Sequence, residues 1–184
     1  MKLHLILLLA LAAPIVTAAP AKKLPKSVKK APVLVWPRIS QADRFSYSAT
    51  NVTMLQLLLR HRGFYKSEPD DVFGPKTQAA VKAFQKQSGL KADGVVGPQT
   101  WEKLVVRVKR GDKGDAVRAA QYLFGFSYSE AGYEIDNLTS DGDGFFGPKT
   151  EKAVRDLQKH DGLKPDGVVG LQTWCILLGG KVKK

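Results

Sequence analysis

The sequence feature that most constrains the fold is an internal repeat. Residues 72–101 and 145–174 align without a gap, and 20 of the 30 positions are identical. Identity at this level indicates a duplicated folding unit. Upstream, the match continues at a separation of 65 residues instead of 73, so the second copy carries eight extra residues, which we place in the loop 127–142. We therefore expect two similar domains, repeat 1 over residues 45–107 and repeat 2 over residues 108–180.

Each repeat predicts three short helices joined by glycine turns. In repeat 1, Val52, Leu55 and Leu59 have the i, i+3, i+7 spacing of a helix with one buried face, and Asn51 is a suitable cap before them. A second helix begins at Pro75, because proline fits the first helical position, where its missing N–H would have no intrahelical partner. The corresponding residues of repeat 2 are Val117, Ala120, Phe124 and Pro148. We expect a mainly α fold of two tandem three-helix bundles.

The stretch DGVVG, which occurs once in each repeat, predicts a tight turn that leads into the third helix. The Asp93 side chain is placed to accept a hydrogen bond from the backbone two residues on, and Gly94 can take the positive φ that such a turn needs. Gly97 then caps the helix, and Trp101 lies in its first turn. In repeat 2, the residues with the same structural roles are Asp166, Gly167, Gly170 and Trp174.

The single cysteine, Cys175, excludes a disulfide within the chain, so apolar cores must hold the repeats together. Cys175 and Leu171 stand where repeat 1 has Glu102 and Pro98, and they lie one helical turn apart on one face. Repeat 2 has therefore exchanged a polar patch for an apolar one. We expect this face to pack against repeat 1, the segment near Trp36, or a second molecule.

The N-terminal part of the chain has the composition of a targeting segment followed by a linker. Residues 1–19 predict a secretory signal peptide, since an apolar run follows Lys2 and ends in small residues, and the run is short of the ~20 residues of a membrane span. Residues 20–44 form a proline- and lysine-rich linker, which we expect to be extended and disordered through residue 41. Residues 181–184 form a basic tail.

The positive charge lies mainly outside the repeats. The net charge is +12, but residues 42–180 contribute only +2 of it. A nucleic-acid-binding domain usually carries its charge on the fold, so we expect no nucleic-acid partner, and no membrane association once the signal peptide is cleaved. The basic extensions suit either weak attraction to an anionic polymer or surface, or simple solvation of a linker.

The combined motif resembles the peptidoglycan-binding-like domain family. The residues of repeat 1 that carry this resemblance are Val52, Leu55-Gln56, Phe73-Gly74, Thr77, Ala80-Val81, Phe84-Gln85, Gly89-Leu90, Asp93–Gly97 and Thr100-Trp101. Repeat 2 matches in the same order. Repeat 1 departs from the family pattern at Asp71, where glycine is usual. Repeat 2 departs at Ala120 and Leu157, where leucine and phenylalanine are usual. The resemblance implies a three-helix fold and a non-catalytic role in holding secreted proteins on bacterial cell wall.

Four glutamines are candidates for ligand contacts, because each repeat has one at each of two equivalent positions: Gln56, Gln85, Gln121 and Gln158. The interpretation that we favour is that these amides tie down loop backbone, since buried amides need partners. The alternative is that they bind peptide or N-acetyl groups in a groove. Tyr128 and Tyr133 offer a sugar-stacking surface in the acidic loop of repeat 2.

The sequence contains no recognisable catalytic constellation. His61 and His160 lack the spacing of zinc ligands, and the turn aspartates are explained by local structure. We therefore expect no enzymatic activity, no metal and no cofactor. The sequence predicts a secreted, extracellular or wall-associated protein that binds peptidoglycan. The alternative is a protein-interaction or pro-segment-like module that docks to a secreted hydrolase.

Overall fold

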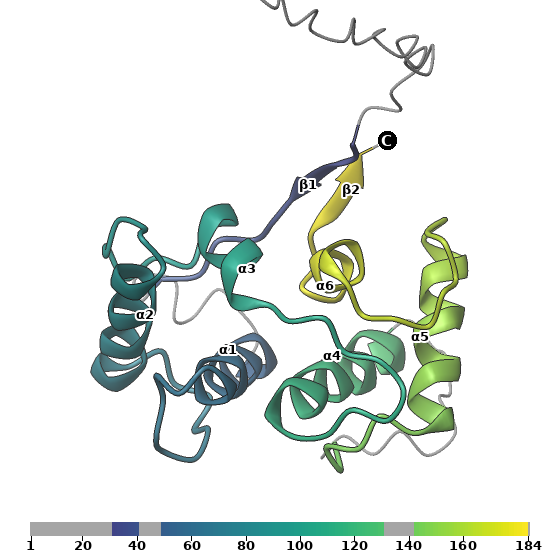
Figure 1. The fold of residues 1–184 in the computed structure, drawn as a ribbon, viewed down its shortest axis with the longest axis horizontal. Helices are drawn as coiled ribbons and strands as arrows, with labels where there is room; N and C mark the ends of the chain where they lie inside the picture. The colour runs from purple at the N-terminus through teal and green to yellow at the C-terminus, as the bar shows by residue number, and fades with distance from the viewer. Residues whose placement is uncertain (1–30, 41–48, 131–141, 184) are drawn as a thin grey trace, which may run out of the picture. The chain divides into compact units, whose positions relative to one another are not determined.

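The computed structural model describes residues 31–40, 49–130 and 142–183, and for the end of the fourth helix, residues 126–130, it describes the backbone alone. The elements in this part of the chain are β1 (Val33–Val35), α1 (Ala49–His61), α2 (Pro75–Gln87), α3 (Pro98–Leu104), α4 (Asp115–Glu130), α5 (Pro148–His160), α6 (Leu171–Leu177) and β2 (Lys181–Lys183). The predicted mainly helical fold with three helices in each repeat is confirmed (Figure 1). The predicted signal peptide lies outside the described residues.

Glycine and proline set the boundaries of the helices. Gly74 caps α2 with extended backbone, and Pro75 occupies the first helical position, as predicted. Beyond α2, Gly89 takes a φ of +68°, and the N–H of Leu90 donates to the carbonyl of Gln85, which closes the helix end. The predicted cap at Asn51 is wrong, because α1 begins two residues earlier, at Ala49.

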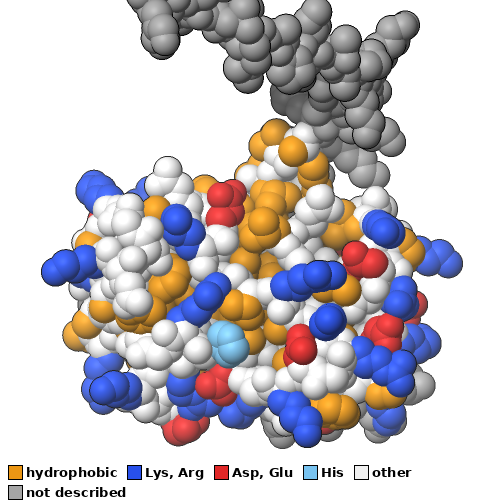
Figure 2. All heavy atoms as spheres, viewed as in Figure 1, with side chains coloured by type: hydrophobic (Ala, Val, Ile, Leu, Met, Phe, Trp, Pro, Cys, Tyr) orange, Lys and Arg blue, Asp and Glu red, His pale blue; other side chains and the backbone are white. Residues whose placement is uncertain are grey.

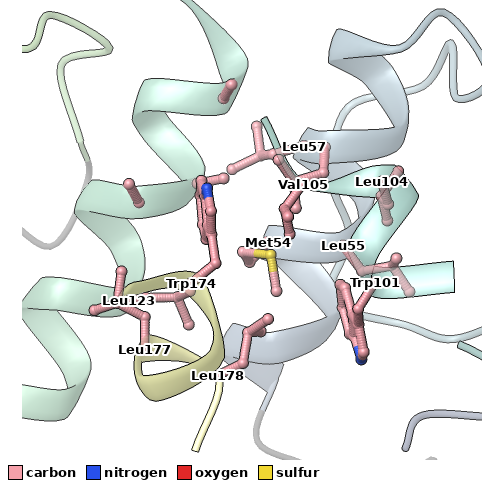
Figure 3. Close-up of a cluster of buried hydrophobic side chains, with 14 of the residues drawn as sticks. Met54, Leu55, Leu57, Trp101, Leu104, Val105, Leu123, Trp174, Leu177 and Leu178 are labelled. Atoms are coloured by element: carbon pink, nitrogen blue, oxygen red, sulfur yellow. The ribbon is translucent and has the colours of Figure 1, made fainter. Parts of the chain in front are cut away.

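Helices α1 and α4, the first helix of each repeat, lie side by side (Figure 1). The apolar stripe predicted for α1 faces its own repeat, but Met54, Leu57 and Leu58 are also almost fully buried. Figure 3 shows Met54 and Leu57 on the side of α1 that faces Trp174 of α6. Buried apolar residues therefore extend beyond the single stripe of a helix that packs on one side. The pairing of the two repeats therefore supplies core that neither repeat would have alone.

Residues 31–40 are ordered against the repeats, so the expected disorder is wrong for this part of the linker. Strand β1 pairs antiparallel with β2, and Leu34 lies opposite Val182. Trp36 and Ile39 are buried. The apolar side chains of this segment suit a half-buried strand. Their burial outweighs the disorder that the lysines and prolines of the linker predicted.

The apolar face predicted on α6 is covered in part by this same segment. Cys175 is fully buried, and its Sγ donates to the carbonyl of Val35 at 3.5 Å. Of the three partners considered for this face, the segment near Trp36 is the one that covers Cys175. Leu171 remains 47% exposed, so the apolar face extends beyond the contact.

Each repeat is closed by an equivalent piece of chain that precedes its first helix. In repeat 1, Ile39 and Val96 form a two-residue antiparallel bridge, and the Trp101 Nε1–H donates to the carbonyl of Pro37 at 2.9 Å. The corresponding contacts of repeat 2 run from Val108 to Val169 and from Trp174 Nε1 to the carbonyl of Val106. The packed unit of repeat 1 therefore starts near residue 36, before the boundary at 45 that we expected.

Candidate functional site

Four polar turns of one design shape the surface of the two repeats. We call them Gln–Asp–Thr turns, because in each a buried glutamine Nε2 donates to an aspartate Oδ1, to the carbonyl two residues after that aspartate, and to a threonine Oγ1. The four sets are Gln56, Asp70 and Thr77; Gln85, Asp93 and Thr100; Gln121, Asp143 and Thr150; and Gln158, Asp166 and Thr173. Each repeat therefore uses the same turn twice, once before its second helix and once before its third.

The turn at Gln158 shows how the loop backbone is fixed. Its Nε2 lies 2.9 Å from both Asp166 Oδ1 and the carbonyl of Val168, and its Oε1 accepts from the N–H of Gly167 at 2.9 Å. The N–H of Val168 also donates to Asp166. This is the predicted bond between the turn aspartate and the backbone two residues after it. Both N–H groups of the amide are therefore used inside the protein, and its oxygen accepts from the turn backbone.

The glutamines therefore fix the shape of the surface turns from the buried side. All four are at most 3% exposed, and their amide groups are engaged with the turns. This geometry corresponds to the interpretation that they tie down loop backbone, and it leaves no free amide group for a ligand. Tyr133 lies outside the described residues, and the structure describes only the backbone of Tyr128, at the end of α4.

Hydrogen bonding in these turns stabilises the charged form of the aspartates. The N–H of Val95 and the amide of Gln85 hold the pKa of Asp93 below its usual value, against the opposing effect of burial. At Asp166, burial raises the pKa, but the bonds from Val168 and Gln158, with the charges of Lys164 and Arg107, lower it more. The turns thus carry a fixed negative charge at neutral pH.

A cavity of about 340 Å³ opens beside the second turn of repeat 2, and its size is within the range of small-ligand sites. Arg107 and Gln172 supply hydrogen-bond donors at its wall, and Leu163 and Leu171 supply apolar surface. Asp166 stands at the same site with its carboxylate. This mixed lining suits a neutral, amide-bearing ligand, since it offers donors, an acceptor and an apolar face together.

Repeat 1 carries nearly the same set of residues in the same places. Eight of the nine lining residues of the cavity are identical at the aligned positions of repeat 1, including Arg38, Leu90 and Gln99, and the exception is Pro98 in place of Leu171. Arg38 and Arg107 are both exposed, and each lies beside a residue that bridges to its repeat's turn valine. The chain therefore presents two closely similar surfaces, which we call the turn sites.

The sequence analysis missed the arginine and the third-helix glutamine of each turn site. Gln99 and Gln172 are identical in the aligned segment, so the repeat itself contained this signal. Arg38 and Arg107 lie before the first helices, at a separation that differs from that of the aligned segment. Their equivalence is visible only once the strand bridges of the two repeats are compared.

Three further observations concern the described residues. No group of three or more histidine, cysteine, aspartate or glutamate side chains in the described part of the chain is arranged to hold a metal ion. Among the helices that the structure describes, none combines the length and the apolar composition that crossing a membrane requires. On the face shown in Figure 2, lysine and arginine side chains are dispersed over the surface.

Comparison with known proteins connects this arrangement to cell-wall proteins. A family model described as "Putative peptidoglycan binding domain" matches residues 48–104 and 113–177. An uncharacterized protein of Kitasatospora aureofaciens is 45% identical over 76 residues, which are 41% of this chain and 61% of that protein. No solved structure matches the chain.

Two enzymes are also similar to the chain. A probable N-acetylmuramoyl-L-alanine amidase of Bacillus licheniformis is 31% identical over 155 residues, with 71% of this chain and 43% of the amidase covered. A spore cortex-lytic enzyme of Bacillus cereus is 38% identical over 69 residues, or 38% of this chain and 26% of the enzyme. The chain spans less than two thirds of the length of each of these three relatives. Because the family model covers both repeats and more than half of the sequence, the chain belongs to the peptidoglycan-binding domain family, with two tandem copies of the domain.

Proposed function

We propose that this chain is a secreted, wall-associated protein that binds peptidoglycan without cleaving it. The observation that carries the proposal is the duplication of the turn site, with eight of nine lining residues identical between repeats. Arg107 is exposed and Gln172 is partly exposed, and neither has an evident task in the core, so their repetition supports a shared ligand. Membership of the peptidoglycan-binding domain family supports the wall polymer as that ligand.

The turn site offers contacts that match the chemistry of peptidoglycan. N-acetyl groups and peptide bonds accept hydrogen bonds through their carbonyls, which Arg107 and Gln172 can donate, and Asp166 can accept from an amide N–H. Leu163 and Leu171 provide apolar surface for methyl groups. The Gln–Asp–Thr turn beneath holds these groups in one arrangement before the ligand arrives, which lowers the entropic cost of binding.

Two turn sites on one chain favour binding to a polymer over binding to its fragments. When one site is occupied, the second is confined near the same strand at a high effective concentration. The basic extensions at either end add attraction to anionic wall polymers that salt weakens. Binding to whole wall material should therefore exceed binding to a single disaccharide-peptide unit by much more than twofold.

Sedimentation of the full chain with purified peptidoglycan tests the proposal. We expect Arg107→Ala with Gln172→Ala to weaken binding, and Arg38→Ala with Gln99→Ala to do the same through repeat 1. Combining the two pairs should remove nearly all binding. Lys86→Ala, which removes an exposed cation from α2, is the control and should bind like wild type.

The salt dependence and the products of the same incubation complete the test. Binding by the turn sites should survive moderate salt, whereas binding that disappears there would come from the lysine-rich extensions. We expect no soluble muropeptides to be released. If the combined variant binds wall material like wild type, the turn sites are wrong, and the alternative of docking to a secreted hydrolase would be tested by pull-down.

A further inference from the structure

A second cavity, of about 320 Å³, lies where the first helices of the two repeats meet. Repeat 1 contributes Thr53, Leu57 and the segment around Asp71 to its lining, and repeat 2 contributes Arg118 and Tyr122. Thr53 and Leu57 align with Arg118 and Tyr122, so equivalent positions of the two helices face the same space. We call this cavity the inter-repeat pocket. It requires both repeats and is distinct from the turn sites.

The pocket opens where repeat 1 departs from the common turn design. In the other three Gln–Asp–Thr turns, the residue after the aspartate is a glycine with positive φ. A larger residue would not fit there, because an added Cβ would lie 2.9 Å from a long side chain of the neighbouring helix. At Gly144 that side chain is Arg118. In repeat 1 the aligned helix residue is the short Thr53, and the glycine position holds Asp71, with a φ of +55°.

These two departures belong together in physical terms. Aspartate is one of the few non-glycine residues that adopt the left-handed region, at some cost relative to glycine, and a long side chain above it would add a clash. The exchange of a long residue for Thr53 leaves room for the Asp71 side chain. A strained residue that lines a cavity and carries a charge is an arrangement often associated with function.

The charges in the pocket are divided between its walls. The Glu68 carboxylate pairs with Arg60 at 2.6 Å, and Asp70 accepts the amide of Gln56, so both are already partnered. Among the described residues, the side chains of Asp71 and Arg118 make no hydrogen bond or ion pair, although the charge of Arg118 acts on Asp115 from a distance. Within the described part of the chain, one unpaired carboxylate from repeat 1 and one unpaired guanidinium from repeat 2 therefore line the same cavity, together with Tyr122.

We propose that the inter-repeat pocket binds a zwitterionic amino-acid end, with Asp71 accepting from its ammonium group and Arg118 donating to its carboxylate. A guanidinium binds a carboxylate through two parallel hydrogen bonds, which makes it selective for that group. This inference rests on the proposed function, because peptidoglycan stem peptides differ in their third residue. Diaminopimelate ends its side chain in a carbon that carries both charges, whereas lysine ends in the ammonium alone.

Calorimetric titration of the full chain with two soluble peptides tests the assignment. The probes are L-Ala-γ-D-Glu-meso-diaminopimelate and L-Ala-γ-D-Glu-L-Lys. Because a hydrogen bond to a charged group contributes about 1.5–3 kcal/mol, we expect the first peptide to bind about 10-fold to 100-fold tighter. Arg118→Gln should abolish this preference, and Asp71→Asn should weaken both peptides. Asparagine tolerates positive φ, so the second variant removes charge while the turn keeps its shape.

Lys86→Gln serves as the control for the loss of one charge, and urea unfolding of each variant verifies the fold. Equal binding of the two peptides, or a preference that survives Arg118→Gln, would overturn the assignment. The absence of any peptide binding would overturn it too. Sedimentation with whole wall material, run in parallel, separates the outcomes: wall binding without peptide binding rejects the pocket alone, and the loss of both rejects the proposed function as well.

Discussion

Removal of one buried turn amide should destabilise repeat 1 far more than removal of an exposed one nearby. The perturbation is Gln85→Ala. The Gln85 Nε2 donates to Asp93 Oδ1 at 3.1 Å, to the carbonyl of Val95 at 2.9 Å and to Thr100 Oγ1 at 3.1 Å, and its Oε1 accepts from the N–H of Gly94 at 2.9 Å. The two N–H groups of Nε2 are thus shared among three acceptors, and all four contacts disappear together in the variant.

The expected loss follows from which groups keep another partner. Asp93 still accepts from the N–H of Val95, and the Thr100 hydroxyl still donates to the Val95 carbonyl. The buried N–H of Gly94 is left without its acceptor, which costs about 1–3 kcal/mol, and each lost bond contributes about 1 kcal/mol net. Since three of the four bonds have this partial compensation, we expect a free energy of unfolding lower by about 3 kcal/mol.

Urea unfolding followed by tryptophan fluorescence measures this change, because Trp101 is fully buried in the same repeat. The control is Gln87→Ala, which removes the same side chain from an exposed position of the same helix and should change the stability by less than about 0.5 kcal/mol. A loss of less than about 1 kcal/mol for Gln85→Ala, within the range of a single net bond, would refute the claim that these amides hold the turns.

Three further predictions concern strain, burial and pH. Asp71→Gly should raise the stability by about 1 kcal/mol, because it removes a non-glycine residue from positive φ, and an unchanged melting temperature would contradict this. The Cys175 thiol should react with a disulfide reagent far more slowly in the native chain than in urea, since burial raises its pKa and β1 covers it; rapid native labelling would show that β1 does not cover it. Asp93 and Asp166 have lowered pKa values in the fold, so the native state binds fewer protons than the unfolded state. Stability is then full above about pH 4 and falls as the pH drops through the folded pKa values. Circular dichroism melts from pH 2 to pH 7 check this, and Asp166→Asn should flatten the dependence.

Much of the fold could be predicted because the signals are local. A glycine followed by proline starts α2, and the aspartate and threonine of each turn lie within eight residues of one another. Their hydrogen bonds close short loops, which requires little chain entropy. The repetition of these signals made the assignment of two three-helix units secure, and the structure confirms it.

The failures came where a distant partner decides the conformation. Residues 33–35 look like part of a charged linker, but they pair with residues 181–183 and cover Cys175. Met54 and Leu57 lie off the predicted stripe of α1, and the second repeat is what buries them. No local pattern reports such a partner, because burial is settled only when the two repeats pack.

By itself, the sequence determined the two units, their helices and the chemistry of the turns, since each depends on contacts between residues close in the chain. Only the tertiary structure decided that the glutamines are buried, that Arg107 and Gln172 share a cavity, and that Asp71 and Arg118 line one pocket. The physical reason is that a pocket is made by surfaces from separate elements. Its lining is therefore fixed by packing over the whole fold.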